Sequence, residues 1–188
     1  SYFIAPIEGD DGYARMIGRS ADLQSANNVI YRINMDSAHV RNFWPAGTNH
    51  DTIDFVLNRR GEVVARFDSD RQSNRWRLYV YDGTTPRLLW EDVSDYGEPV
   101  QIDGMLPDGR FVAQYEDDAG FSGLYAIDRQ SGAAEALFRR DNAEVGDAIN
   151  DPWTREIVGV SWIEVETHQQ FFDPQLEVAR QALAVRLP

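Results

Sequence analysis

Two serines of this sequence follow a glycine in the way that a hydrolase nucleophile does. They stand in the strings Gly159-Val160-Ser161 and Gly120-Phe121-Ser122-Gly123. A nucleophile elbow reads Gly-x-Ser-x-Gly, because the sharp turn from strand to helix needs a glycine on both sides of the serine. Neither string has the second glycine at that spacing, and both fall in strand or loop context. We therefore predict no catalytic residue in this chain.

Metal and thiol chemistry have few candidates. The three histidines are His39, His50 and His168. His50, with Asp51 and Asp54 close by, offers ligand types that zinc and manganese accept. The same segment alternates apolar and polar residues over 52–57, which is typical of a strand, so we interpret these side chains as structural. Cysteine is absent, which excludes a thiolate metal site and a cysteine nucleophile. We predict no metal and no cofactor.

Acidic residues form the remaining candidate site. Asp68 with Asp70, and Asp117 with Asp118, each follow an expected central strand at matching positions. Neither group has the ligand register or the sixth-position glycine of a calcium loop. We expect both groups to lie in loops on the same rim of the fold. Our hypothesis is that this negative rim attracts a positively charged substrate N-terminus, in which case Asp-to-Asn variants would raise the Michaelis constant for free-amine peptides.

Composition narrows the classes of partner. The net charge of −13 repels nucleic acid phosphates and anionic lipid heads, so we predict neither partner. The sequence contains no apolar run of about 18 residues, so we predict no transmembrane helix. The first residues lack the basic and apolar regions of a signal peptide, and they lack an initiator methionine. We expect a processed chain or a piece of a longer one.

An internal repeat of about 47 residues is the most informative feature of the sequence. Tyr31, Tyr79 and Tyr125 are spaced by 48 and 46 residues. Each belongs to a β-prone run that ends in Asn or Asp, namely Ile30–Asn34, Leu78–Asp82 and Leu124–Asp128. A second strand follows each run after a short turn. Two runs joined in this way predict a hairpin in every repeat.

A second motif precedes each of these runs. It is a tight turn followed by a strand, and its copies are Gly9–Met16, Asn58–Ala65 and Leu106–Ala113. Gly12, Gly61 and Gly109 are spaced by 49 and 48 residues, and glycine supplies the positive φ of such turns. A degenerate fourth copy covers Asn150–Val160, with Arg155 or Glu156 in place of the glycine.

These motifs predict an all-β fold. One repeat holds about four short strands, which is the size of a propeller blade. We predict a single partial β-propeller domain over 1–188, with about four four-stranded blades at 1–50, 51–98, 99–145 and 146–172. A β-sandwich with coincidental spacing is the alternative, but two motifs that repeat in the same order and phase favour the propeller.

A short helix is predicted over 174–187. Asp173 is a good N-cap and Pro174 a good first residue. Leu176, Ala179, Leu183 and Leu187 form one apolar stripe at helical spacing. We expect this stripe to pack on the last blade or to cover an exposed edge.

The strings Leu106–Ala113, Leu124–Asp128 and Ala136–Phe138 resemble blades of the prolyl oligopeptidase family of serine peptidases, closest to its acylaminoacyl-peptidase and dipeptidyl-aminopeptidase branch. The blades of TolB-type propellers are similar. The ending Phe171–Pro174 with its helix resembles an insertion in bacterial members of the peptidase family. The resemblance implies a propeller of about seven or eight blades that screens peptides by size above an α/β-hydrolase domain with a Ser-Asp-His triad.

The resemblance therefore implies a non-catalytic propeller fragment of a bacterial hydrolase, in the cytoplasm or the periplasm, whose partners are a peptide substrate and a hydrolase domain absent from this chain. Open blade edges predict self-association of the isolated chain. Two alternatives stay open. One is a stand-alone TolB-like module that binds a protein, and the other is a small propeller enzyme that acts on sugars through paired carboxylates.

Overall fold

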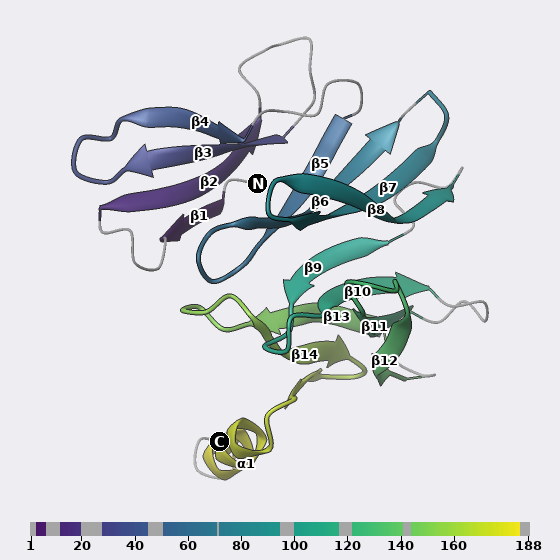
Figure 1. Ribbon diagram of the computed structural model, residues 1–188. Coiled ribbons are helices and arrows are strands. Elements are labelled where there is room, and N and C mark those ends of the chain that lie inside the picture. The colour runs from purple at the N-terminus through teal and green to yellow at the C-terminus, as the bar shows by residue number, and fades with distance from the viewer. Residues whose placement is uncertain are drawn as a thin grey trace. The chain divides into compact units, whose positions relative to one another are not determined.

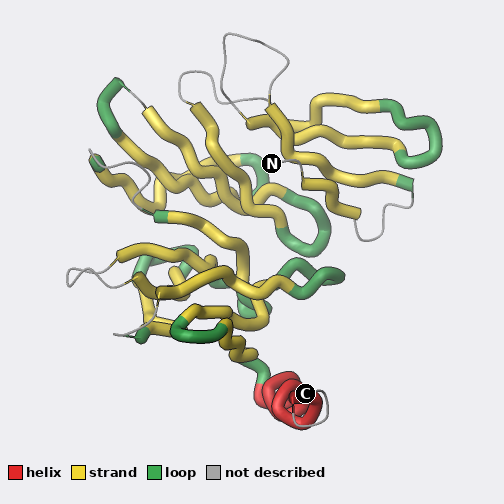
Figure 2. Tube along the Cα trace, turned by 180° about the vertical axis from the view of Figure 1, so that it is seen from behind, coloured by secondary structure: helices red, strands yellow, loops and turns green. Residues whose placement is uncertain are grey.

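The computed structural model describes residues 3–6, 12–19, 28–44, 51–70, 72–94, 100–116, 122–140 and 144–184. The chain divides into two compact units, Ser1–Pro99 and Val100–Pro188. Each unit contains two antiparallel β-sheets, and the second unit ends in a helix (Figures 1 and 2). No helix among the described residues is both long enough and apolar enough to cross a membrane.

The first unit holds two four-stranded sheets. The first sheet consists of β1 (Phe3–Pro6), β2 (Tyr13–Arg19), β3 (Asn28–Asn34) and β4 (Val40–Trp44). The second consists of β5 (Asp51–Leu57), β6 (Val63–Asp70), β7 (Arg75–Asp82) and β8 (Thr85–Val93). In both sheets each strand pairs with the next one along the chain, so each sheet is an up-and-down meander.

The second unit holds a four-stranded and a three-stranded sheet. The former consists of β9 (Gln101–Met105), β10 (Phe111–Glu116), β11 (Ser122–Ile127) and β12 (Ala134–Arg139). The latter consists of β13 (Glu144–Asn150), β14 (Ile157–Ile163) and β15 (Thr167–Phe171), followed by α1 (Pro174–Ala184).

This succession of meanders confirms the predicted fold class, a partial β-propeller with a C-terminal helix. The last sheet differs from the expectation of four strands, because a helix begins where its fourth strand would stand. Pro174 has no N–H to donate to a ladder. Asp173 Oδ1 accepts hydrogen bonds from the N–H groups of Gln175 at 2.7 Å and Leu176 at 3.4 Å, which confirms the predicted N-cap.

In each of the four sheets a residue with a positive φ stands shortly before the second strand. Gly12, Gly61 and Gly109 have φ values of 82°, 68° and 89°. In the degenerate fourth copy Arg155 takes the same place with φ 64°. The left-handed conformation is therefore a property of the repeat, and the non-glycine residue at Arg155 bears the steric cost that the glycines avoid.

Replacement of Gly109 by alanine should destabilise the chain by about 1 kcal/mol, because a Cβ is unfavourable in the left-handed region. A Cβ at this position would meet no atom within 4 Å, so the cost comes from the backbone alone. Gly109→Asn is the matched variant, and it should lose less because asparagine tolerates this conformation. Urea denaturation measures both. Equal stability of Gly109→Ala and the wild type would contradict the prediction.

The turn between the third and fourth strands explains why the first and third β-prone runs end in Asn and Asp. Asn34 Oδ1 accepts hydrogen bonds from the N–H groups of Asp36 and Ser37. Asp128 Oδ1 does the same for Gln130 and Ser131. These bonds are Asx turns, in which the side chain replaces a backbone acceptor.

A continuous apolar core joins the two sheets of the second unit. Val112, Leu124 and Phe138 of one sheet pack with Val160 and Trp162 of the other. The Phe138 and Trp162 rings have centroids 4.8 Å apart. Burial of facing apolar sheet surfaces is the interaction expected between consecutive blades.

Among its described residues, the first unit has a core of the same kind. Ile30 of β3 packs with Phe55, Val63 and Tyr81 of the second sheet. Within that sheet the Phe67 ring lies near the rings of Trp76, at 5.8 Å between centroids, and of Trp90, at 6.2 Å. The core of the first unit therefore also lies between consecutive sheets.

The helix does not pack as predicted. Leu176 and Leu183 of the expected stripe are 44% and 58% exposed, and Leu187 lies outside the described residues. A polar contact joins the helix to β15 instead, because Glu177 Oε2 accepts the N–H of Phe171 at 2.9 Å. Within the helix, Arg180 pairs with Glu177 at 2.6 Å. These hydrogen bonds, with that from Arg180 as the largest cause, lower the pKa of Glu177 to about 2.

Candidate functional site

The serines of the two glycine-serine strings have structural partners. Ser161 lies in β14, where its Oγ donates to the carbonyl oxygen of Asp147 at 3.1 Å and accepts the N–H of Asp147 at 3.0 Å. Ser122 lies in β11, and its Oγ is 3.2 Å from Gln114 Nε2. Both hydroxyls therefore connect neighbouring strands within a sheet.

The described histidines lie in different units. His168 stacks on Trp162 with ring centroids 5.2 Å apart, and His39 lies in the β3–β4 turn. His50 lies outside the described residues, so the hypothetical ligand group with Asp51 and Asp54 is not described as a whole. Within the described ranges, no cluster of three or more His, Cys, Asp or Glu side chains could hold a metal ion.

The predicted acidic rim is only partly described. Asp117 and Asp118 lie outside the described residues. Asp70 ends β6 and organises the β6–β7 turn, since its carboxylate accepts the N–H of Gln72 at 3.0 Å and the hydroxyl of Ser73 at 2.7 Å. Asp68 does not lie in a loop, which corrects the expected placement. It is part of strand β6 and only 1% exposed.

Asp68 belongs to a buried polar network of three strand residues. Its Oδ1 accepts the hydroxyl of Thr52 at 2.8 Å, and its Oδ2 is 2.8 Å from Arg66 Nη2. Thr52 is the register partner of Asp68 on β5, and the Arg66 guanidinium lies 5.0 Å from the centroid of the Tyr79 ring. A buried carboxylate needs such partners to offset the loss of hydration. We therefore interpret this network as one that stabilises the sheet rather than as part of a binding site.

Basic residues face the same strand region and offset its acids. Arg75 and Arg77 of β7 are the register partners of Asp70 and Asp68. Both also pair with Glu91 of β8, with 2.6 Å between Arg77 Nε and Glu91 Oε2. The hydrogen bond from Arg77 is the main cause that lowers the pKa of Glu91. The described part of the rim thus has mixed charge.

A second pair of acids, which the sequence analysis did not single out, lies in the second unit. Asp103 is the residue of β9 that the β9–β10 ladder skips, and Asp147 is one of the two residues of β13 that the β13–β14 ladder skips. Burial raises the pKa of Asp103 to about 6, against the hydrogen bond from Gln101 Nε2 at 2.7 Å, and the negative charge of Asp147 contributes. An acid with so high a pKa can exchange a proton near neutral pH.

The sequence carried a weak signal for this pair. Asp103 precedes Gly109 by 6 residues, and Asp147 precedes Arg155 by 8 residues, so both lie in the first strand of their repeat. Strand irregularities re-aim side chains and are frequent next to functional sites. A search for acids within the expected first strand of each repeat would have found both positions.

The sheets and turns define the chain as an all-β protein built of propeller blades. No family model matches the sequence, and no curated protein matches it significantly. Among solved structures, the chain is similar to the β-propeller domain of the Trilobed protease from Pyrococcus furiosus, with 11% identity over 90% of this chain and 57% of that one, and a TM-score of 0.47.

Two further solved structures show the range of similar proteins. The periplasmic gluconolactonase of Pseudomonas aeruginosa is 17% identical over 94% of this chain and 52% of its own, with a TM-score of 0.42. The acylaminoacyl peptidase of Pyrococcus horikoshii is 12% identical over 90% and 32%, with a TM-score of 0.44. The chain thus spans between about a third and somewhat more than half of these structures.

Proposed function

We propose that this chain is a non-catalytic part of the β-propeller of a serine peptidase similar to the prolyl oligopeptidase family. In this proposal the blades control the access of peptides to a hydrolase domain that is not part of the chain. The observation that carries it is the pair of motifs in the third repeat. The sequences of Leu106–Ala113 and Leu124–Asp128 resemble blades of that family. These two segments supply the neighbouring strands β10 and β11.

The two serines that follow a glycine in nucleophile-like strings support a non-catalytic role. The Ser161 hydroxyl both donates to and accepts from the backbone of Asp147, and Ser122 is held beside Gln114. A nucleophilic serine needs a base within hydrogen-bond reach to take its proton. In this proposal the nucleophile, its histidine and its acid all belong to the hydrolase domain.

The natural protein tests the proposal. An antibody raised against the 188-residue chain would be used to isolate the protein from its own host, and its intact mass and its labelling by a fluorophosphonate probe would be measured. We expect a polypeptide several times heavier than 21.4 kDa that the probe labels. An unlabelled protein near 21.4 kDa would overturn the proposal and favour the stand-alone protein-binding module.

One observation favours a second candidate function, hydrolysis of a sugar derivative through paired carboxylates. Asp103, whose pKa is raised to about 6 mainly by burial and in part by the charge of Asp147, is of the kind that can act as a general acid in sugar hydrolysis. Purified chain would be assayed on aryl glycosides and sugar lactones. Turnover that is lost in Asp103→Asn would support this function, and absence of turnover in the wild type would contradict it.

A further inference from the structure

Asp-Gly steps are places where a protein backbone can rearrange without an enzyme. The side-chain carbon of the aspartate can be attacked by the main-chain nitrogen of the next residue, and glycine has no side chain to block the approach. The sequence has four such steps, which begin at Asp11, Asp82, Asp103 and Asp108. Asp11 lies outside the described residues, so the structure compares the other three.

The step at Asp82 lies at the tip of an exposed hairpin. Asp82 ends β7, its register partner Thr85 begins β8, and a loop of two residues joins them. Asp82 and Gly83 are exposed, and neither the Asp82 carboxyl group nor the Gly83 N–H has a hydrogen-bond partner among the described residues. A Cβ at Gly83 would meet no atom within 4 Å. Both reacting groups are therefore accessible and unbonded.

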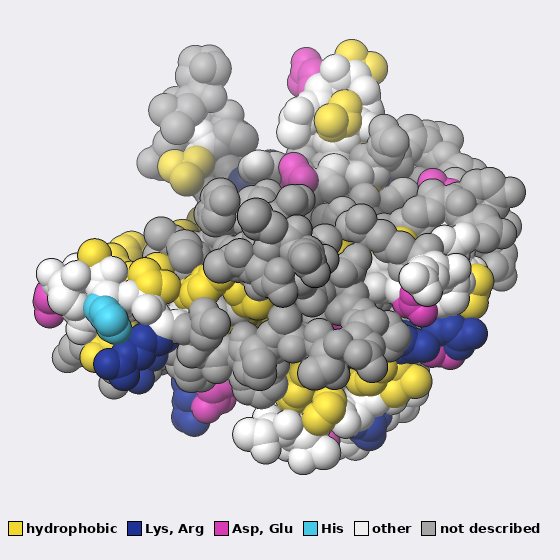
Figure 3. Space-filling model, turned by 90° about the horizontal axis from the view of Figure 1, so that it is seen from above, with side chains coloured by type: hydrophobic (Ala, Val, Ile, Leu, Met, Phe, Trp, Pro, Cys, Tyr) yellow, Lys and Arg dark blue, Asp and Glu magenta, His cyan; other side chains and the backbone are white. Residues whose placement is uncertain are grey.

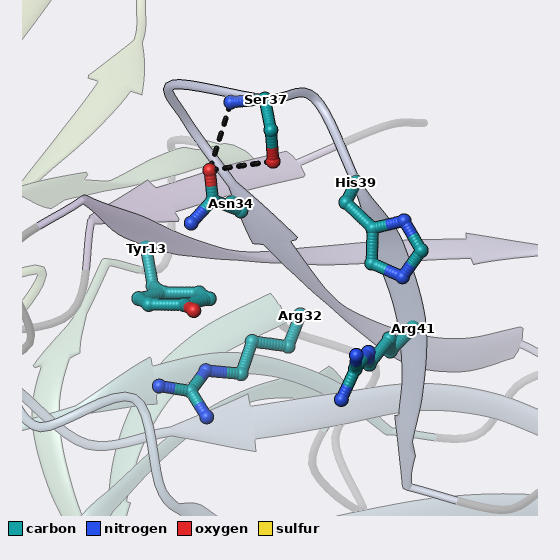
Figure 4. A pocket seen from close by; sticks show the side chains of 6 residues that line it. All are labelled: Tyr13, Arg32, Asn34, Ser37, His39 and Arg41. Atoms are coloured by element: carbon teal, nitrogen blue, oxygen red, sulfur yellow. Dashed lines mark hydrogen bonds between the residues drawn. The ribbon is translucent and has the colours of Figure 1, made fainter.

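The corresponding turns of two other sheets hold the same position differently. Asn34 Oδ1 accepts hydrogen bonds from the N–H and the hydroxyl of Ser37, both at 2.8 Å (Figure 4). Asp128 Oδ1 accepts the N–H of Ser131 at 2.7 Å. In neither turn does a glycine follow the Asn or Asp. Of these three run-ending residues, Asp82 alone combines an unbonded side chain with a following glycine.

The step at Asp108 is restrained by its neighbours. Asp108 Oδ2 is 2.8 Å from both Nε and Nη2 of Arg110, and these contacts lower the pKa of Asp108. The low pKa disfavours the neutral acid, which is the form that loses water. The N–H of Gly109 donates to the carbonyl oxygen of Leu106 at 2.9 Å, so the nitrogen is also engaged. Some acidic side chains on the face drawn in Figure 3 likewise lie directly beside basic ones.

The step at Asp103 has a more reactive acid but a restrained backbone. Burial raises the pKa of Asp103 to about 6, which increases the neutral share of its carboxyl group at pH 7. Gly104, however, lies opposite Val112 in the β9–β10 ladder, and Met105 is bridged to Glu156. Attack on the side chain requires rotation of the backbone, which would break this pairing. Opening of paired strands costs more free energy than motion at a hairpin tip, so we expect the fold to protect this step.

We propose that Asp82 is a site of spontaneous isomerisation to isoaspartate. The Gly83 nitrogen forms a bond to Asp82 Cγ while the C–OH bond of the neutral carboxyl group breaks, and the hydroxyl leaves with the N–H proton as water. Water then adds to the main-chain carbonyl carbon of Asp82, and the bond from that carbon to the nitrogen breaks. The main chain now runs through Cγ, with composition and charge unchanged. This inference does not depend on the proposed peptidase role.

The product would weaken the hairpin, because isomerisation adds one methylene group to its main chain. The longer loop cannot keep Asp82 directly opposite Thr85, so the pairing of β7 with β8 is disturbed at this end. The preceding residue, Tyr81, is 4% exposed and packs in the core of the first unit. We therefore expect a protease to cut the isomerised chain several times faster than the unmodified chain.

The test is incubation of the full chain at pH 7.4 and 37 °C for several weeks. Peptide mapping by electron-transfer mass spectrometry then distinguishes isoaspartate from aspartate of equal mass. We expect at least fivefold more isoaspartate at Asp82 than at Asp103 or Asp108. An amount at Asp82 that is no greater than at either of the other two steps would overturn the proposal.

The same incubation in concentrated guanidinium chloride is the control for local sequence. In the unfolded chain the three steps share the same Asp-Gly chemistry, so their amounts of isoaspartate should differ less than threefold. A preference for Asp82 that persists unchanged in the denaturant would show that the fold is not its cause, and would overturn the structural argument.

Asp82→Glu tests the consequence for the hairpin, because attack on a glutamate side chain closes a larger and less favourable ring. Isomerisation at this position should fall at least tenfold, and the variant should keep its protease resistance during storage. Asp108→Glu is the matched control, and it should isomerise at Asp82 as the wild type does. Equal loss of protease resistance in stored Asp82→Glu and stored wild type would contradict the expected weakening of the hairpin.

Discussion

Replacement of Asp68 by asparagine should destabilise the chain by about 3 kcal/mol, because it leaves the Arg66 cation without its carboxylate partner. The carboxylate is 1% exposed and lies 2.8 Å from both Thr52 Oγ1 and Arg66 Nη2. Asparagine cannot supply the second anionic oxygen. Urea denaturation at one protein concentration, followed by circular dichroism, measures the loss.

Asp70→Asn is the matched control, since it removes the same charge two residues further along β6. Asp70 holds the β6–β7 turn by accepting hydrogen bonds from Gln72 and Ser73, and asparagine also forms such turns. We expect a change within about 0.5 kcal/mol. Equal stability of Asp68→Asn and Asp70→Asn would refute the structural role of Asp68.

The double variant Asp68→Asn with Arg66→Met gives a second measure of the same pair. If the loss comes from a buried cation without a partner, removal of that cation should restore part of the stability. The double variant should then be more stable than the sum of the two single losses. The result also bears on the acidic rim hypothesis, because a Michaelis constant altered by Asp68→Asn would reflect a damaged sheet.

Replacement of Asp103 by asparagine should stabilise the chain by about 2 kcal/mol at pH 7.5. Burial raises the folded-state pKa of Asp103 to about 6, from an ordinary value of 3.8. A carboxyl group with a raised pKa contributes stability below its ordinary pKa, and this contribution is lost as the pH rises through the raised value. Asparagine is neutral at every pH and can still accept the hydrogen bond from Gln101.

The pH dependence distinguishes this explanation from a simple packing effect. The difference in unfolding free energy between Asp103→Asn and the wild type should be close to zero at pH 4 and should grow between pH 4 and 7. Asp128→Asn is the control. The hydrogen bond from Ser131 is the main cause that lowers the pKa of Asp128. Replacement of the Asp128 carboxylate should therefore be slightly destabilising at neutral pH. A gain for Asp103→Asn that does not vary with pH would contradict the prediction.

Features that depend on neighbours along the chain were predictable from the sequence. Glycines at the repeat spacing have the expected positive φ, and Asp173 caps the helix that begins at Pro174. Asn34 and Asp128, which end two of the three β-prone runs, form Asx turns. All of these interactions span at most four residues, so residue type and spacing are sufficient to predict them.

Features that depend on residues far apart in the chain needed the tertiary structure. Asp68 looked like a loop acid, but its burial follows from pairing with Thr52, 16 residues away. The raised pKa of Asp103 follows mainly from its burial and in part from the charge of Asp147, 44 residues further along the chain. Strand register, burial and the exposed helix stripe are set by packing between elements, and a local pattern does not contain that information.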